Sequence, residues 1–232
     1  MSTADIVTNI VSDFAFVGII ALLYWLIYAA IYRKRLTQAL GFFNFDQDAP
    51  TRIFVSGFEH QGVKTKRVVN ALELESALLL KDELTHPPRS GLLPKLASLL
   101  AQLIGQSLSY PEPIIEPAPL ERASGPVSHR SVILIGGPVA NALSDYYLQT
   151  SSPSFKFNPA SSRYQAREGA QYTDVPTSDN LAVIEKLVYE DQVVILLHGI
   201  GEEQTVRAVR HLKEHWRHLW SMHDRRAFAI SV

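Results

Sequence analysis

An uncharged, apolar run near the N-terminus constrains this chain more than any other feature. Residues 14–32 read FAFVGIIALLYWLIYAAIY, nineteen residues with one glycine and neither a charge nor a proline. As an α-helix, this run would be about 29 Å long at about 1.5 Å per residue, close to the hydrocarbon thickness of a bilayer. We therefore predict a single transmembrane helix over residues 14–32, within an N-terminal segment 1–35.

The residues that flank this run predict its orientation. Arg33, Lys34 and Arg35 follow it directly, whereas Asp5 and Asp13 precede it and no lysine or arginine does. Because lysine and arginine favour the cytoplasmic side of a span, we expect a single-pass protein of the inner cell membrane. Its N-terminus would lie outside the cell and its C-terminal domain in the cytoplasm. A cleaved signal peptide would instead begin with basic residues and be shorter, and a buried helix of a soluble protein is a further alternative.

Aromatic residues gather toward the basic end of the run, as they do at membrane interfaces. With Phe14 and the three basic residues, the expected membrane contacts are Tyr24, Trp25, Tyr28 and Tyr32. The tyrosines recur every four residues and therefore share one helix face. That face would lie at the headgroups, or it would form a helix–helix contact or a pore-facing stripe in a homo-oligomer, a dimer or tetramer.

Composition limits what the rest of the chain does. The chain has 232 residues and a net charge of −1, so we expect neither direct DNA binding nor binding of long RNA. It contains no cysteine, which excludes disulfides, thiol nucleophiles and cysteine-based zinc sites. His211, His215 and His218 share one face of a predicted helix, but the chain has no HExxH pattern. We expect surface histidines here rather than a metal site.

The chain divides into the anchor, a connector at 36–50 and a cytoplasmic domain at 51–232. In the first half of this domain, the pattern predicts a strand over 51–58, a helix over 68–84 with Glu73 and Glu75 facing solvent, and an amphipathic helix over 92–108. Residues 110–126 hold five prolines and are expected to form an extended connector.

The second half alternates apolar strands with helices. The expected strands are 131–135, 192–197 and 227–232, and the expected helices are 141–148, 180–189 and 203–222. This alternation is typical of a mainly parallel sheet covered by helices. The sequence therefore predicts a Rossmann-like α/β domain.

Glycine-rich turns at the ends of the expected strands are the candidate ligand-binding loops. Glycines allow close approach of a phosphate, and the helix that follows offers free N–H groups. The candidate residues in the three turns are Ser56, Gly57, Gly136, Gly137, Asn141, His198, Gly199, Gly201 and Thr205. The turns match neither GxGxxG nor the phosphate loop, and the alternative is that the glycines serve tight turns alone. Glu202 and Glu203 oppose a strongly anionic ligand unless they point away.

Catalysis receives less support than binding. The turn His198-Gly199-Ile200-Gly201 is similar to the oxyanion loop of α/β-hydrolases, but the chain contains no GxSxG nucleophile motif. Carboxylates that would suit a nucleoside-processing enzyme are Glu73, Glu75, Asp145 and Asp174. No pair of them has a spacing that requires a mechanism, so the sequence leaves enzymatic activity open and assigns no catalytic residue.

The predicted architecture, with the turns SVILIGGPVAN and VVILLHGIGEEQTVRAV, resembles the membrane-anchored sensor–effectors of prokaryotic antiviral defence, including CRISPR systems. In these, a Rossmann-like domain of the CARF, SAVED or SLOG type binds a nucleotide second messenger. The resemblance implies that Gly199, Gly201 and Thr205 touch the ligand, and that binding rearranges an oligomer and alters membrane integrity. The run Gly201-Glu202-Glu203-Gln204-Thr205 departs from the usual Gly-Gly-Thr type, which argues against cyclic oligoadenylate in particular.

The expected ligand is thus a nucleotide second messenger such as a cyclic nucleotide or cyclic oligoadenylate, and no cofactor is expected. Two other functions remain open. One is a membrane-tethered enzyme that processes nucleosides or nucleotides. The other is a non-catalytic membrane scaffold that recruits a protein partner.

Overall fold

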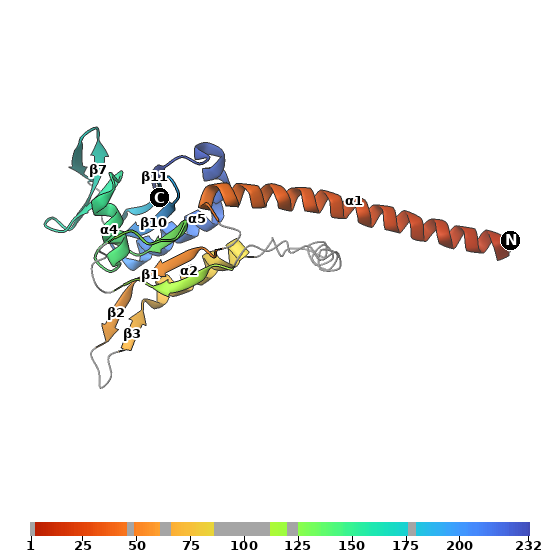
Figure 1. Cartoon of the computed structure of the whole chain (residues 1–232), viewed down its shortest axis with the longest axis horizontal. Helices are drawn as coiled ribbons and strands as arrows, with labels where there is room; N and C mark the ends of the chain where they lie inside the picture. Colours follow the sequence, from red (N-terminus) through yellow and green to blue (C-terminus); the bar gives the residue numbers. More distant parts are fainter. Residues whose placement is uncertain (1–2, 46–48, 61–65, 86–111, 120–124, 176–179) are drawn as a thin grey trace. The chain divides into compact units, whose positions relative to one another are not determined.

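The computed structural model describes residues 3–45, 49–60, 66–85, 112–119, 125–175 and 180–232 (Figure 1). The chain forms two compact units. One comprises Met1–Thr37 and Pro87–Leu108, and the other comprises Gln38–His86 and Ser109–Val232. The described part of the first unit is helical, and the second unit contains all of the described strands.

Helix α1 (Thr3–Phe43) contains the apolar run, which confirms that this run is helical. The large apolar side chains from Phe14 to Ile27 are exposed, and Phe14 reaches 75% exposure. Within the described residues, however, the structure holds no helix long and apolar enough to cross a membrane. Tyr24 and Lys34 are exposed and Trp25 is half-buried, whereas the side chains of Tyr28, Tyr32, Arg33 and Arg35 lie outside the described residues.

A six-stranded sheet organises the second unit. Its strands follow the order β11-β9-β10-β5-β1-β4. Their bounds are β1 (Arg52–Val55), β4 (Ile114–Pro117), β5 (Ser131–Ile135), β9 (Ala182–Val188), β10 (Val193–Gly199) and β11 (Phe228–Ser231). Strands β4, β1, β5 and β10 are parallel to one another, and β9 runs antiparallel to both β10 and β11. The mainly parallel α/β sheet predicted from the sequence is therefore confirmed.

Helices cover both faces of this sheet (Figure 1). Successive side chains of a strand point to opposite faces. Ile133 and Ile135 accordingly pack with α2 (Ala71–Thr85), α5 (Glu202–His223) and Phe42 and Phe43 at the end of α1. Val132 and Leu134 pack on the other face with α4 (Ala142–Thr150). The two-sided burial explains why β5 and β10 are apolar throughout.

The helix predicted over 180–189 is wrong, because these residues form strand β9. Its positions Ala182 to Leu187 are all buried, and β10 and β11 pair with its two edges. Its charged residues Glu185 and Lys186 are both buried within the sheet layers, at 2% and 0% exposure.

Three further expectations need correction. The predicted strand 51–58 divides at Ser56 into β1 and β2 (Gly57–His60), and β2 pairs with β3 (Lys66–Val69). The predicted helix 68–84 therefore begins only at Ala71, after Asn70 accepts from the amides of Leu72 and Glu73. The proline-rich connector contains the edge strand β4, where proline is tolerated. The helix predicted over 92–108 lies outside the described residues.

A small antiparallel sheet between α4 and β9 was not predicted. It consists of β6 (Phe155–Asn158), β7 (Arg163–Glu168) and β8 (Gln171–Asp174). Tyr164 of β7 is fully buried and packs with Leu181 and Val183. The remaining elements, β5, α4, β10, α5 and β11, lie where the sequence predicted them.

Candidate functional site

The order of the strands reverses between β1 and β5. From β1, the chain passes through α2 to β4 on one side, whereas β5 and then β10 lie on the other side. In open α/β sheets, ligands bind beyond the carboxyl ends of the strands at such a switch point. The three predicted loops follow β1, β5 and β10, so the topology brings them to this one edge of the sheet.

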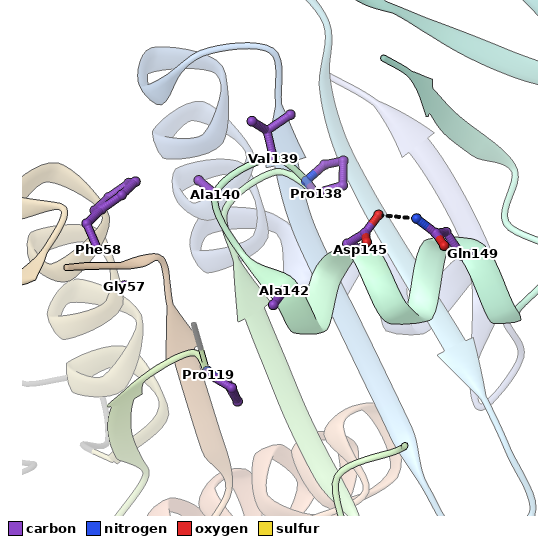
Figure 2. Close-up of a pocket in the computed structure, with 9 residues that line it drawn as sticks. All are labelled: Gly57, Phe58, Pro119, Pro138, Val139, Ala140, Ala142, Asp145 and Gln149. Atoms are coloured by element: carbon purple, nitrogen blue, oxygen red, sulfur yellow. Dashed lines mark hydrogen bonds between the residues drawn. The ribbon is translucent and has the colours of Figure 1, made fainter. Parts of the chain in front are cut away.

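A pocket of about 160 Å³ lies at this edge. Its walls come from the loops after β5 and β10, the first turns of α2 and α5, strand β2 and the small sheet. The side chains that line it include Phe58, Asn70, Glu73, Phe157, Tyr164, Ile200, Glu202 and Thr205. A larger hollow of about 390 Å³ shares Phe58 and residues 138–140 with the pocket. Figure 2 shows Val139 and Pro138 on the loop beside this hollow, with Phe58 across from them and Asp145 on α4.

The glycines at this edge allow the loops to approach one another closely. Gly136 has a φ of +117°, and a Cβ there would lie 2.2 Å from the Oγ of Ser56. A Cβ on Gly137 would lie 3.1 Å from the carbonyl oxygen of Gly199. On Gly199 itself, a Cβ would lie 2.3 Å from the Cβ of Gln204. These glycines are therefore required for the packing of the loops, whether or not a ligand binds.

The predicted site residues divide into two groups. Five of them line the pocket or the hollow: Gly57, Gly137, Gly199, Gly201 and Thr205. The other four, Ser56, Gly136, Asn141 and His198, do not line either one. Asn141 is buried and caps α4, since its Oδ1 accepts from the amides of Leu143 and Ser144. These four residues position the loops rather than face the pocket.

His198 forms a buried pair with Tyr164. Its Nδ1 lies 2.7 Å from the Tyr164 hydroxyl, and its Nε2 has no hydrogen-bond partner among the described residues. Burial lowers the pKa of His198 to about 3 and raises the pKa of Tyr164 well above its usual value. Both groups are therefore neutral at physiological pH, and the pair ties the small sheet to the end of β10.

Glu73 was expected to face solvent, and this expectation is wrong. It is 4% exposed and lines the pocket, and its Oε2 accepts from the amide of Ser56 at 2.9 Å. Burial raises the pKa of Glu73, the Ser56 amide partly offsets this, and the nearby Glu202 raises the pKa further. The spacing Asn70-x-x-Glu73, typical of a helix start, was the available signal.

Glu202 does not point away from the pocket. It lines the pocket at the first turn of α5, and its Oε1 accepts from the Nδ2 of Asn70 at 2.5 Å. The pocket thus carries two carboxyl groups, and its lining, drawn from the described residues, contains no lysine or arginine. This chemistry favours hydrogen-bond donors over an anion at this position.

Comparisons with known proteins assign no family to this chain. No protein-family model matches the sequence, and no curated protein gives a significant match. Within the described part of the chain, no three histidine, cysteine, aspartate or glutamate side chains are placed to hold a metal ion. The resemblance to antiviral sensor–effectors therefore stays a prediction that rests on the residues of two turns.

Proposed function

We propose that this protein is a membrane-anchored sensor whose α/β domain binds a nucleotide second messenger. The observation that carries this proposal is the pocket at the switch point, with the adjoining hollow. Ligand binding would rearrange a homo-oligomer and alter membrane integrity, in antiviral defence as the resemblance implies. A single helix encloses no pore, so the proposed output requires several copies of the chain.

The lining of the pocket supports a nucleotide as the ligand. Phe58, which lines both the pocket and the adjoining hollow, offers aromatic surface on which a planar base packs. Helix α5 begins at Gly201 in the pocket wall without a side-chain cap, and a helix N-terminus presents backbone N–H groups to a ligand. Carboxyl and amide groups supply the polar contacts that fix a ligand's orientation.

The exposed apolar side chains of α1 support the membrane anchor. Burial of one Val, Leu, Ile or Phe side chain contributes about 1.5–3 kcal/mol, and nine such side chains from Phe14 to Ile27 each show 48% exposure or more. A lipid bilayer is the partner that we propose for them, with the C-terminal domain in the cytoplasm. Transfer of this segment into lipid would remove from water the largest stretch of exposed apolar side chains among the described residues.

The cysteine-free chain allows a direct test of this topology. Ser2→Cys and Ser161→Cys each introduce a single thiol, one near the N-terminus and one in an exposed turn of the small sheet. In intact cells, a membrane-impermeant maleimide should label only the first variant, and permeabilised cells should show both. Labelling of neither or both variants in intact cells, or release of the protein from membranes by alkaline carbonate, would contradict the proposal.

Ligand binding is tested with the full chain in detergent micelles against linear and cyclic nucleotides. At a concentration about 100-fold above the dissociation constant, a ligand should stabilise the fold by about 2.7 kcal/mol. Val139→Asp adds a negative charge at an exposed position that lines the pocket, and Val188→Asp is a control at an exposed position outside it. The first variant should weaken nucleotide binding and the second should not. No stabilisation by any nucleotide would favour the protein-recruiting scaffold.

A membrane-tethered nucleoside- or nucleotide-processing enzyme is the second candidate, and Glu73 is the observation that favours it. A buried carboxyl group with a raised pKa in a pocket is typical of a general acid. Chromatography of each nucleotide after incubation with the protein separates the two functions. Products that the wild type forms and Glu73→Gln does not form would support the enzyme, whereas binding without products supports the sensor.

A further inference from the structure

We propose that the pocket binds the sugar of the nucleotide, with Glu73 and Glu202 accepting hydrogen bonds from its free hydroxyl groups. This inference rests on the proposed nucleotide binding and specifies which part of the ligand the pocket holds. The phosphate groups would lie outside this pocket.

The first argument comes from incomplete hydrogen bonding at Glu73. Its carboxyl group is buried, and its Oε2 accepts from the Ser56 amide at 2.9 Å. A carboxylate has about four lone-pair sites on its two oxygens, and buried polar groups in proteins are almost always paired. The pocket lies against this carboxyl group, so a hydroxyl-bearing ligand there would supply a further partner.

The second argument is the charge of the pocket. Glu202 adds a second carboxyl group, and Asn70 occupies one of its oxygens and leaves the other oxygen to a ligand. The described lining offers no cation to a phosphate, and two carboxylates repel one. Neutral hydroxyl groups instead donate to carboxylates in strong, charge-assisted hydrogen bonds.

The third argument is size. Sites for whole drug-sized ligands occupy about 300–1,000 Å³, and the pocket has about 160 Å³. It therefore has room for one ring of a nucleotide rather than for the whole molecule. The adjoining hollow of about 390 Å³ begins at the shared residues Phe58 and Val139 and has room for the base.

The experiment compares ribonucleotides with analogues that lack the hydroxyl groups. The full chain in detergent micelles is titrated with AMP, GMP, CMP and UMP, with their 2′,3′-dideoxy counterparts, and with inorganic phosphate. For each ribonucleotide that binds, we expect at least tenfold weaker binding of its dideoxy counterpart and no binding of phosphate alone. Equal affinity for both sugars, or stabilisation by phosphate alone, would overturn the inference and leave nucleotide binding intact. Absence of binding by all of these probes would overturn the inference, and only absence of binding by the cyclic nucleotides as well would overturn the proposed function.

Two matched variants locate the contact. Glu202→Gln and Glu203→Gln are neighbouring, exposed, isosteric changes in the first turn of α5, and only Glu202 lines the pocket. Glu202→Gln should lower ribonucleotide affinity about tenfold and reduce the preference over the dideoxy analogue, because a charge-assisted hydrogen bond is lost. Glu203→Gln should leave both quantities unchanged. The same loss in both variants would indicate a general charge effect and refute the contact.

Discussion

Removal of one hydroxyl group, in Tyr164→Phe, tests whether the buried Tyr164–His198 pair holds the small sheet to the main one. Both side chains are 0% exposed, and their hydroxyl and Nδ1 atoms lie 2.7 Å apart. Phenylalanine keeps the ring that packs with Leu181 and Val183. It leaves Nδ1 of His198 without a partner, and Nε2 already has none among the described residues.

The expected cost follows from this geometry. A buried polar group that loses its only partner costs about 1–3 kcal/mol, whereas loss of an exposed hydrogen bond costs little. Tyr172→Phe is the matched control in the same small sheet, because its hydroxyl donates to the Pro153 carbonyl at 2.7 Å in a partly exposed position. Urea unfolding of the full chain in detergent micelles, with compared midpoints and slopes, measures both variants. Equal losses in the two variants would refute the role assigned to the buried pair.

The same pair predicts a dependence of stability on pH. Burial lowers the pKa of His198 to about 3 from its usual 6.5, so between these values the unfolded chain binds more protons than the folded one. The contribution of His198 to stability is therefore lost as the pH falls from about 6.5 toward 3, by up to about 1.4 kcal/mol per pH unit. His198→Leu should lose this part of the slope. An unchanged slope in that variant would show that other groups carry it.

Three further outcomes follow from described contacts. Gly41→Ala should lower the free energy of unfolding by about 1–3 kcal/mol, because its Cβ would lie 2.3 Å from a ring atom of Trp220. Gly18→Ala is the control and should lower it less, because a Cβ there meets nothing within 4 Å. Urea unfolding compares the two variants. Burial raises the pKa of Glu185 to about 7. The contribution of Glu185 to the free energy of unfolding is therefore present below about pH 4.5 and is lost as the pH rises through 7. Unfolding curves measured over this pH range should show the loss in the wild type and not in Glu185→Gln. Burial lowers the pKa of Lys186 to about 8. The buried charge therefore lowers the free energy of unfolding below pH 8, and this free energy rises between pH 8 and 10.5 as the group loses its proton. Lys186→Met should abolish the rise in the same series of unfolding curves.

Local pattern predicted those elements whose burial matches their periodicity. The apolar runs of β5 and β10 and the long amphipathic α5 are determined by their own residues, so they were predicted with small errors at their ends. Strand β9 was mistaken for a helix because it lacks the usual strand pattern. A strand with one exposed face alternates apolar and polar residues, whereas both faces of β9 are buried, with Glu185 and Lys186 on opposite faces. What overrides the helical pattern is pairing with β10 and β11, which the segment itself does not encode.

The candidate site was predicted in its backbone but not in its chemistry. The glycines of the turns marked the loops, since close approach requires small residues at Gly136 and Gly199. The buried carboxyl group of Glu73 comes from an element distant in sequence from the β5 and β10 turns. Its environment depends on α2 lying against the end of β1, which becomes visible only in the fold.

The hairpin of β9 and β10 has a consequence for how the sheet assembles. Its seven paired positions close through a short turn in which the Tyr189 amide donates to the Gln192 carbonyl. The pairing of β1 with β5, by contrast, joins residues about eighty positions apart, and such distant contacts close slowly. We expect the hairpin to form first during folding and to offer the edge of β10 as a template for β5. The loop that follows β1 at the switch point would then be among the last parts of the domain to acquire its structure.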